Sequence, residues 1–376
     1  MRATMNDATC SNKRQATVAC FVVLALAACT HPFADSPGAT ADGTTADNST
    51  ADTTAADSTA ADTPRVPTAL TLTGPAPALF DCTSLASPGG GIPASRRATV
   101  PLGCVLDAAC KERLVVGHRG AGGEFARIAP ENSLASIRAA LWMGYDGVEL
   151  DVRDTADGGL VMLHDGKVDR TTTTTGEVHK LTLAQVTAMP LRALGPGQEP
   201  YPGDFACEKV PTLAEALALV KGRVFVDLDC KTSRMDLVVP AIEKAGVVDQ
   251  VFVSVSNYEV AVAARKLNPK IRVQIRPDTM DELLEALAKF PERPPEIVEV
   301  PTELVADLAP KVNSLPAAVF TNGFPRDVFA RVAASSGEPI DPAPYLALYA
   351  AGAKIVQSEF PGAVLAALGR VPPVGK

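Results

Sequence analysis

The feature that most constrains this chain is an alternation of short β-rich runs with amphipathic helical patterns, which begins near Arg113 and recurs about eight times. Strands are expected at 114–116, 147–152, 160–163, 224–230, 251–255, 271–275, 297–300, 317–321 and 354–357. Helices are expected at 131–143, 213–220, 237–245, 259–267, 280–290 and 304–312, followed by a helical pair reaching Ala351. Such alternation predicts a parallel sheet, and its count fits a closed (β/α)8 TIM barrel better than an open doubly wound sheet.

Composition narrows the class of protein further. The chain has 376 residues, 47% of them hydrophobic, so it can bury a sizeable core and wholesale disorder is excluded. Its formal net charge is -8, and the sequence contains no basic stripe. Because phosphate neutralisation needs clustered Lys and Arg, no nucleic-acid partner is expected.

The N-terminus predicts export. Lys13 and Arg14 precede an apolar run over 16–28, which is too short to span a bilayer and suits a signal peptide over 1–28. The run ends in Leu-Ala-Ala-Cys29, which resembles the lipobox of bacterial lipoproteins. We therefore expect a periplasmic or cell-surface protein that is membrane-anchored through a lipidated Cys29; the alternative is a simple secretory signal.

Between the signal and the barrel, two segments differ in composition. Residues 29–68 begin with the lipobox cysteine and are mainly Ala, Thr, Asp and Ser, which predicts a disordered linker. Residues 69–112 form a cysteine-containing segment before the barrel domain, which is assigned to 113–376. Cys230, inside a core strand, is expected to be a buried free thiol. The other four cysteines are expected to form two disulfides, and three connectivities are possible. These cysteines are Cys82, Cys104, Cys110 and Cys207.

Carboxylates mark the strand ends where barrel active sites lie. Glu149 and Asp151 are two apart on a strand and share a face, so they repel each other unless a proton or cation intervenes. Asp227 and Asp229 repeat the pattern, and Asp229 is the better third ligand because it is nearer the strand end. We expect Glu149, Asp151 and Asp229 to bind one divalent cation, Ca²⁺ or Mg²⁺, because all the ligands are oxygens. The alternative is a structural ion-pair cluster, and Asp227 either orients the ligands from behind or is purely structural.

Two histidines, His118 and His164, also follow expected strands beside these carboxylates. Imidazoles titrate near neutrality, so one can take a proton while the other gives one. We interpret His118 as the base and His164 as the acid, although the sequence leaves their order open.

These residues lie in motifs that resemble the glycerophosphodiester phosphodiesterase family. The resemblance covers roughly 113–370 and rests on His118-Arg119-Gly120, Pro130-Glu131-Asn132-Ser133, the segment 144–183, Pro211-Thr212-Leu213 with Glu215, Asp229-Cys230-Lys231, the VFTN of 319–322 and Ser358-Glu359-Phe360-Pro361. Three departures are Asp229, where the family has Glu, Phe320, where it has Trp, and a longer loop between Gly120 and Pro130 together with an extended threonine run at 171–175.

The resemblance implies a (β/α)8 barrel with a small insertion after the His164 strand. It also implies a cation on the three carboxylates, two essential histidines, phosphate contacts from Arg119 and Lys231, and Glu131 supporting them. The implied activity is metal-dependent hydrolysis of small glycerophosphodiesters to glycerol 3-phosphate and an alcohol. Two alternatives are a lysophospholipase D or phospholipase C-like enzyme acting on lipids, which an apolar rim would favour, and a non-catalytic surface-binding lipoprotein.

Overall fold

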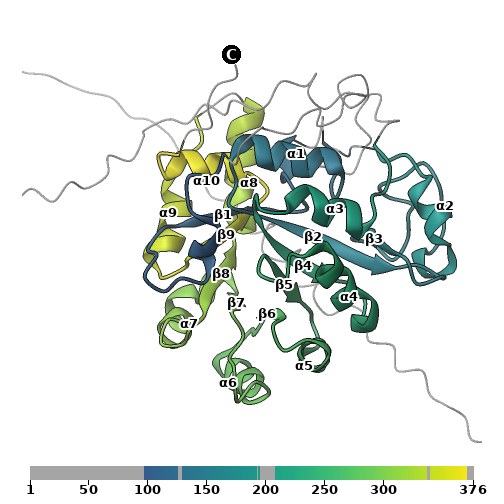
Figure 1. Cartoon of the computed structure of the whole chain (residues 1–376). Coiled ribbons are helices and arrows are strands. Elements are labelled where there is room, and N and C mark those ends of the chain that lie inside the picture. The colour runs from purple at the N-terminus through teal and green to yellow at the C-terminus, as the bar shows by residue number, and fades with distance from the viewer. Residues whose placement is uncertain (1–96, 126–128, 193, 195–207, 337–338, 371–376) are drawn as a thin grey trace, which may run out of the picture. The chain divides into compact units, whose positions relative to one another are not determined.

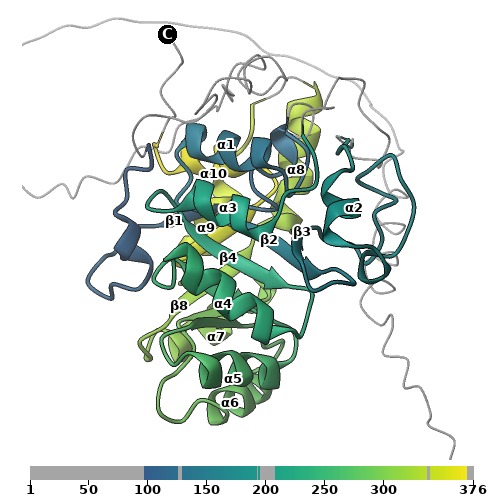
Figure 2. The same cartoon turned by 45° about the vertical axis from the view of Figure 1, so that its right-hand side comes forward.

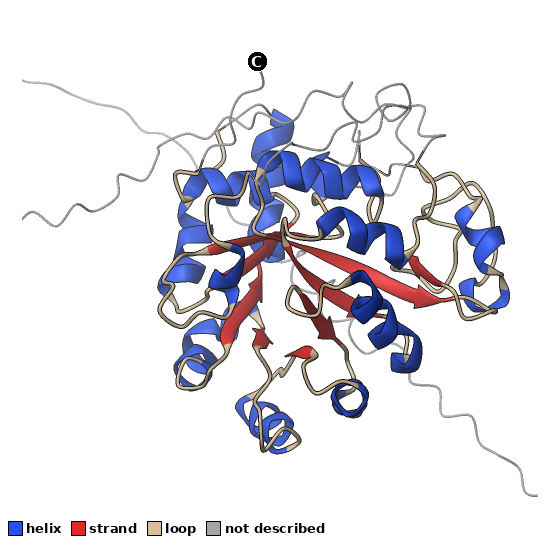
Figure 3. Ribbon diagram, in the orientation of Figure 1, coloured by secondary structure: helices blue, strands red, loops and turns tan. Residues whose placement is uncertain are grey.

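The computed structural model describes residues 97–125, 129–192, 194, 208–336 and 339–370. Its single sheet closes on itself, because β1 pairs with both β2 and β9 (Figures 1 and 3). The parallel strands of the ring are β1 (Leu114–Gly117), β2 (Gly147–Asp154), β4 (Phe225–Cys230), β5 (Val251–Ser254), β6 (Arg272–Ile275), β7 (Ile297–Val300), β8 (Ala318–Asn322) and β9 (Ile355–Ser358). The predicted (β/α)8 barrel is therefore confirmed.

Helices cover the outside of this ring (Figure 3). They are α1 (Leu134–Met143), α3 (Leu213–Val220), α4 (Met235–Ala245), α5 (Tyr258–Leu267), α6 (Met280–Ala288), α7 (Val305–Val312), α9 (Ala343–Ala350) and α10 (Pro361–Ala367). A further helix, α8 (Phe324–Ser336), begins directly after the C-terminal end of β8. Local sequence sets their ends: Thr212 caps α3 in a capping box with Glu215, which stabilises a helix by about 1 kcal/mol. Among the described residues, no helix has the length and apolarity needed to cross a membrane.

The strand expected at 160–163 forms, but it is not a strand of the barrel. This strand, β3 (Leu160–Met162), runs antiparallel to β2 and pairs with residues 152–154 of it. The reason is that β2 continues beyond the ring, and a turn at 155–158 folds the chain back along it. The insertion that follows carries the short helix α2 (Leu183–Thr187) to one side of the barrel (Figure 2) and packs a small apolar cluster of its own.

The barrel interior changes from apolar to polar along the strands. At the N-terminal end, Leu114, Phe225, Phe252 and other strand-starting side chains form an apolar layer. Residues 97–112 cover this end with a 3-10 turn, Leu102–Val105, whose Cys104 and Val105 pack against that layer. Toward the C-terminal end the inward positions are polar, so the strand ends carry the chemistry.

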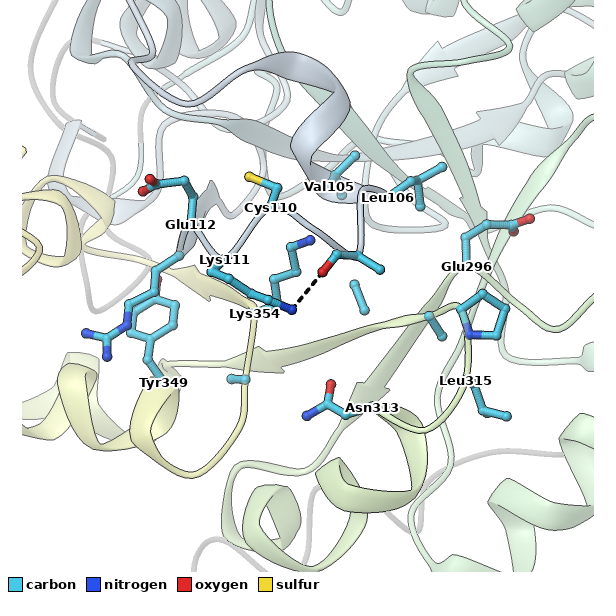
Figure 4. A pocket seen from close by; sticks show the side chains of 16 residues that line it. Val105, Leu106, Cys110, Lys111, Glu112, Glu296, Asn313, Leu315, Tyr349 and Lys354 are labelled. Atoms are coloured by element: carbon cyan, nitrogen blue, oxygen red, sulfur yellow. Dashed lines mark hydrogen bonds between the residues drawn. The ribbon is translucent and has the colours of Figure 1, made fainter.

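A pocket of about 550 Å³ lies at the covered N-terminal end (Figure 4). Most of the residues that line this pocket lie just before a strand or at its start, and Lys354 and Tyr349 are among them. It is therefore at the opposite end of the barrel from the carboxylates.

Two cysteine predictions bear on this part of the chain. Cys104 and Cys110 form a disulfide with a Cα–Cα distance of 5.3 Å, which agrees with one of the three connectivities. Cys230 is a buried free thiol, as predicted. Cys82, Cys207, the signal peptide, Cys29 and the linker lie outside the described residues, so the second disulfide and the anchor stay predictions.

Candidate active site

Three buried carboxylates meet at the C-terminal mouth of the barrel. Glu149 and Asp151 come from β2 and Asp229 from β4, and one oxygen of each lies within 4.8 Å of the others. This acidic trio is the set of residues that the sequence analysis selected as cation ligands.

The register of β2 and β4 explains why Asp227 is excluded from the trio. Asp151 is level with Asp229, and Glu149 is level with Asp227, one layer deeper in the barrel. The extra methylene of Glu149 lets its carboxylate reach the upper layer, whereas the shorter Asp227 stays below. Asp227 instead accepts a hydrogen bond of 2.9 Å from Gln274.

Two basic side chains, Lys231 and Arg276, lie close to Asp229 in the trio. Lys231 Nζ lies 2.7 Å from Asp229 and 3.3 Å from Asp151, and Arg276 Nη2 lies 3.0 Å from Asp229. Burial would raise the pKa of Asp229, but Arg276 and Lys231 outweigh it and lower that pKa. The pKa of Glu149 is raised well above its usual range by burial and then by the charges of Asp151 and Asp229. Negative charge therefore remains in excess around Glu149.

His118 stands at the edge of the trio, directly after β1. Its Nδ1 lies 2.5 Å from Glu359 Oε1, and its Nε2 lies 3.8 Å from Glu149 Oε2. Burial raises the pKa of Glu359, but the neighbouring His118 more than reverses this and brings it to about 2. Glu359 thus holds the imidazole with Nε2 directed to the trio. Glu359 lies in the Ser-Glu-Phe-Pro motif, but no role was predicted for it from the sequence.

His164 reaches the same mouth by a different route from the one expected. It follows β3, not a barrel strand, and the antiparallel direction of β3 returns the chain to Asp151, whose carbonyl accepts the Leu163 N–H. His164 Nδ1 lies 2.7 Å from Asp165 Oδ1, and Arg170 Nε donates to the other oxygen of Asp165 at 2.7 Å. Each candidate histidine is therefore held through Nδ1 by a carboxylate.

The turn after β1 fastens Arg119 to the trio. Arg119 has a positive φ of 51°, and its backbone N–H donates to Glu149 Oε2 at 2.8 Å. Gly120 is required next to it, because a Cβ there would lie 2.2 Å from Ser136 Oγ. Arg119 Nη1 pairs with Glu131 at 2.8 Å, while its buried Nε has no hydrogen-bond partner among the described groups. Glu131 also pairs with Arg170 at 2.6 Å, so it links Arg119, which follows His118, to Arg170, which pairs with Asp165.

Asn132 fixes the position of Asp151. Its Nδ2 donates to Asp151 Oδ2 at 2.8 Å, and its Oδ1 accepts the Asp151 N–H at 2.9 Å. Asn132 has a positive φ of 56°, which brings both groups of its short side chain to β2.

A belt of buried and half-buried hydrogen bonds supports the trio from below. Gln274 donates to Asp227 and to Glu299, and Asn322 donates to the second oxygen of Glu299. Arg276 joins this belt to Asp229 through its bond of 2.7 Å to Glu299. Arg276, Gln274 and Glu299 were missed from the sequence. A usable signal was that Gln274 and Glu299 lie on successive strands and that Arg276 follows Gln274 at the inward period of two.

Together, the fold and this geometry define a barrel protein with an acidic, oxygen-only centre flanked by two oriented histidines. The family model for "Glycerophosphoryl diester phosphodiesterase family" matches residues 118–287. Residues 118–287, which include both histidines and the acidic trio, are therefore similar to that family.

Individual relatives agree with the family match. A glycerophosphodiester phosphodiesterase of Caldanaerobacter subterraneus is 32% identical over 167 residues, which are 43% of this chain and 65% of the relative. Human glycerophosphodiester phosphodiesterase 1 is 45% identical over 104 residues, 27% of this chain and 29% of the relative. The matches therefore span less than two thirds of these relatives.

Solved structures show the same fold. A glycerophosphoryl diester phosphodiesterase from Parabacteroides distasonis superposes with a TM-score of 0.59 at 20% identity, covering 75% of this chain and 96% of that one. A phosphodiesterase from Oleispira antarctica, solved in complex with the product sn-glycerol-3-phosphate, gives 0.53 at 23% identity, covering 70% and 99%.

Proposed function

We propose that this protein hydrolyses glycerophosphodiesters to glycerol 3-phosphate and an alcohol. The observation that carries the proposal is the acidic trio at the barrel mouth with a carboxylate-held histidine on each of two neighbouring segments. The family match and the product bound by the Oleispira antarctica relative support the same substrate class.

The trio fits a resident divalent cation. Its ligands are buried oxygens, its charge is in excess around Glu149, and hard ions such as Ca²⁺ and Mg²⁺ prefer carboxylates. Glu149, Asp151 and Asp229 would hold the ion, which when bound would neutralise negative charge on the phosphoryl oxygens. Titration of the protein with each ion distinguishes Ca²⁺ from Mg²⁺.

The reaction itself uses the substrate's own hydroxyl. A glycerol hydroxyl next to the phosphate ester attacks phosphorus through a five-membered ring, and such proximity lowers the barrier by several kcal/mol. His118 Nε2 takes the hydroxyl proton as the new P–O bond forms, while Glu359 holds Nδ1–H and stabilises the imidazolium. His164 gives a proton to the leaving alcohol as the old P–O bond breaks, and Asp165 keeps its ring in place. Water then opens the cyclic phosphodiester with the two roles reversed, which restores both histidines.

Two basic side chains would bind the phosphate during these steps. Arg119 presents an Nε that lies 3.6 Å from Asp151 Oδ2 and has no hydrogen-bond partner among the described groups, and Lys231 lies beside Asp151 and Asp229. Their charges oppose the negative charge that develops on the phosphoryl oxygens.

Leaving-group dependence tests the assignment of the two histidines. His164→Ala should strongly reduce hydrolysis of glycerophosphocholine but spare a nitrophenyl ester of glycerol phosphate, since nitrophenolate leaves without a proton. His118→Ala should abolish both activities. His179→Ala is the matched control, because His179 is 65% exposed in the insertion. Equal, small losses from His118→Ala and His164→Ala would contradict the acid–base pair; the inverse pattern would exchange their roles.

We also propose that the protein is anchored to a membrane through a lipidated Cys29, as its lipobox-like sequence predicts. Cys29→Ser should move the protein from the membrane fraction to the soluble fraction and leave glycerophosphocholine hydrolysis unchanged. Cys10→Ser, in the same leader, is the control and should stay with the membrane. An unsubstituted protein found wholly in the soluble fraction would contradict the proposal.

A further inference from the structure

Helix α8 is an additional helix at the mouth of the barrel. The connections between successive strands from β4 to β8 each contain one α-helix, whereas the β8–β9 connection contains both α8 and α9. Helix α9 buries Tyr345, Leu348 and Tyr349 and leads directly back to β9, so it covers the barrel wall. Helix α8 begins just after the C-terminal end of β8. It therefore lies at the rim and is not needed to cover the sheet.

The outward side of α8 is apolar. Val328, Phe329 and Val332 are 58%, 69% and 62% exposed, and Pro325 is exposed as well. Spacings of three, four and seven residues place these four side chains, here called the α8 face, on one side of the helix. The other large hydrophobic side chains exposed in the described part of the chain are fewer on each helix: Leu267 on α5, and Met280 and Leu284 on α6. A contiguous apolar cluster of this kind marks an interaction surface, whereas single exposed side chains do not.

The α8 face is continuous with the candidate active site. Phe324, the first residue of α8, packs its ring on His118 with 4.7 Å between the ring centroids. Asp327, one turn on, is buried and accepts hydrogen bonds from the Ser358 hydroxyl at 2.6 Å and the Glu359 N–H at 2.7 Å. The helix is thus attached to the same Glu359 that holds His118. Val332 lies about 12 Å from Phe324 along the axis of α8.

Charge on α8 suits a phosphate-bearing surface. Arg326 and Arg331 lie on the same helix, and within the described residues neither forms an ion pair. An apolar face flanked by guanidinium groups can insert into acyl chains while it contacts lipid phosphates.

We propose that the α8 face seats in a lipid surface, so that the site accepts glycerophosphodiesters that belong to that surface, namely lysophospholipids. This proposal rests on the proposed function for the headgroup chemistry. A lysophospholipid presents its phosphodiester to His118 and its acyl chain to the adjoining apolar helix. A small soluble glycerophosphodiester offers no apolar group that would cover these side chains.

Tryptophan at the α8 face tests the lipid contact directly. The full-length chain carries Phe329→Trp, and its fluorescence is measured with vesicles of phosphatidylcholine and phosphatidylglycerol whose acyl chains are brominated, after subtraction of the signal from native Trp142. Bromine should quench the new tryptophan and shift its emission to the blue. Leu284→Trp on α6, on the other side of the barrel from α8 (Figures 1 and 2), is the control and should stay unquenched.

Equal quenching at positions 329 and 284 would overturn the lipid contact. A blue shift at 329 that depends on protein concentration and not on vesicles would also overturn it, because it would assign the face to a second copy of this chain.

Substrate preference tests the functional consequence. Phe329→Ser combined with Val332→Ser should lower the ratio of kcat/KM for dispersed lysophosphatidylcholine to kcat/KM for glycerophosphocholine by about tenfold or more, because apolar burial with the acyl chain is lost. Leu284→Ser should leave that ratio unchanged. An unchanged ratio in the double variant would overturn the proposal. Absence of hydrolysis of every glycerophosphodiester would instead overturn the proposed function, while the quenching result would still decide the lipid contact.

Discussion

Cation binding at the acidic trio should stabilise the whole barrel. We expect a divalent cation to raise the Tm of the unsubstituted protein by about 5 °C when the ion is present at about 100 times its Kd. Glu149→Gln, which removes one of the three ligand charges, should lose most of this increase. The measurement is thermal unfolding by circular dichroism in chelator and in excess Ca²⁺ or Mg²⁺.

The magnitude follows from linkage and from the size of the barrel. Binding at 100 times the Kd contributes about 2.7 kcal/mol to the free energy of unfolding. A barrel the size of residues 97–370 has an unfolding entropy of about 0.6 kcal/mol per degree, and the quotient is about 5 °C. If the substitution weakens binding about 100-fold, the same ion concentration contributes only about 0.4 kcal/mol, or less than about 1 °C.

Removal of the ion should also reverse the order of the Tm values of Glu149→Gln and the unsubstituted protein. Burial and the charges of Asp151 and Asp229 raise the pKa of Glu149 in the folded state, so without a cation the folded protein loses stability as pH rises above the unfolded pKa of this group. Glu149→Gln has no such loss. In chelator at pH 8 the variant should therefore melt at or above the unsubstituted protein, and with the cation it should melt below it.

A matched control separates this effect from the removal of any buried acid. Asp227 lies level with Glu149 on the next strand, and burial raises its pKa to about 8. Because it stands outside the trio, Asp227→Asn should keep the full cation-dependent increase. Equal increases in Glu149→Gln and the unsubstituted protein would refute the assignment of the trio as the ion site.

Two further predictions concern buried groups near the site. Burial raises the pKa of Glu124 from 4.5 to about 8, so the contribution of its protonated form to the free energy of unfolding is fully present below about pH 4.5 and falls by about 5 kcal/mol as pH rises through 8. Urea unfolding at pH 5 and pH 8 should show that Glu124→Gln does not lose this stability, and a difference between the two proteins that is equal at both pH values would contradict the prediction. Asn132→Ala should cost about 3 kcal/mol in the same assay, because it leaves buried groups of Asp151 without their partners and places Ala at a positive φ; a loss below about 1 kcal/mol would contradict this.

Much of the fold was predictable because hydrophobic periodicity and capping are local. The strand at 297–300 and the helix at 213–220 have the predicted bounds, and Thr212 marks the helix start in the sequence itself. The direction of β3 was not predictable in this way, because an apolar run carries no information about which neighbour it pairs with. The role of residues 97–112 in covering the barrel depends on contacts with several distant strands.

The candidate site was likewise predictable only where local sequence periodicity determines the position of a residue. Glu149 and Asp151 share a face by the period of the strand, and the position of Asp229 near its strand end placed it beside them. Glu359 and Arg276 come from distant parts of the chain, and only closure of the barrel brings them to His118 and Asp229. Their partners depend on strand register, which the sequence pattern does not specify. Apolar residues on α8 likewise give no sign of lying at the mouth until the extra helix is seen.

The most direct test of the account is to identify the products formed from glycerophosphocholine, with and without chelator. The full-length protein should release glycerol 3-phosphate and choline, chelator should lower the rate by orders of magnitude, and Ca²⁺ or Mg²⁺ should restore it. Glu149→Gln should remain folded and inactive under all three conditions. Release of phosphocholine and glycerol, or a rate that chelator does not change, would contradict the account.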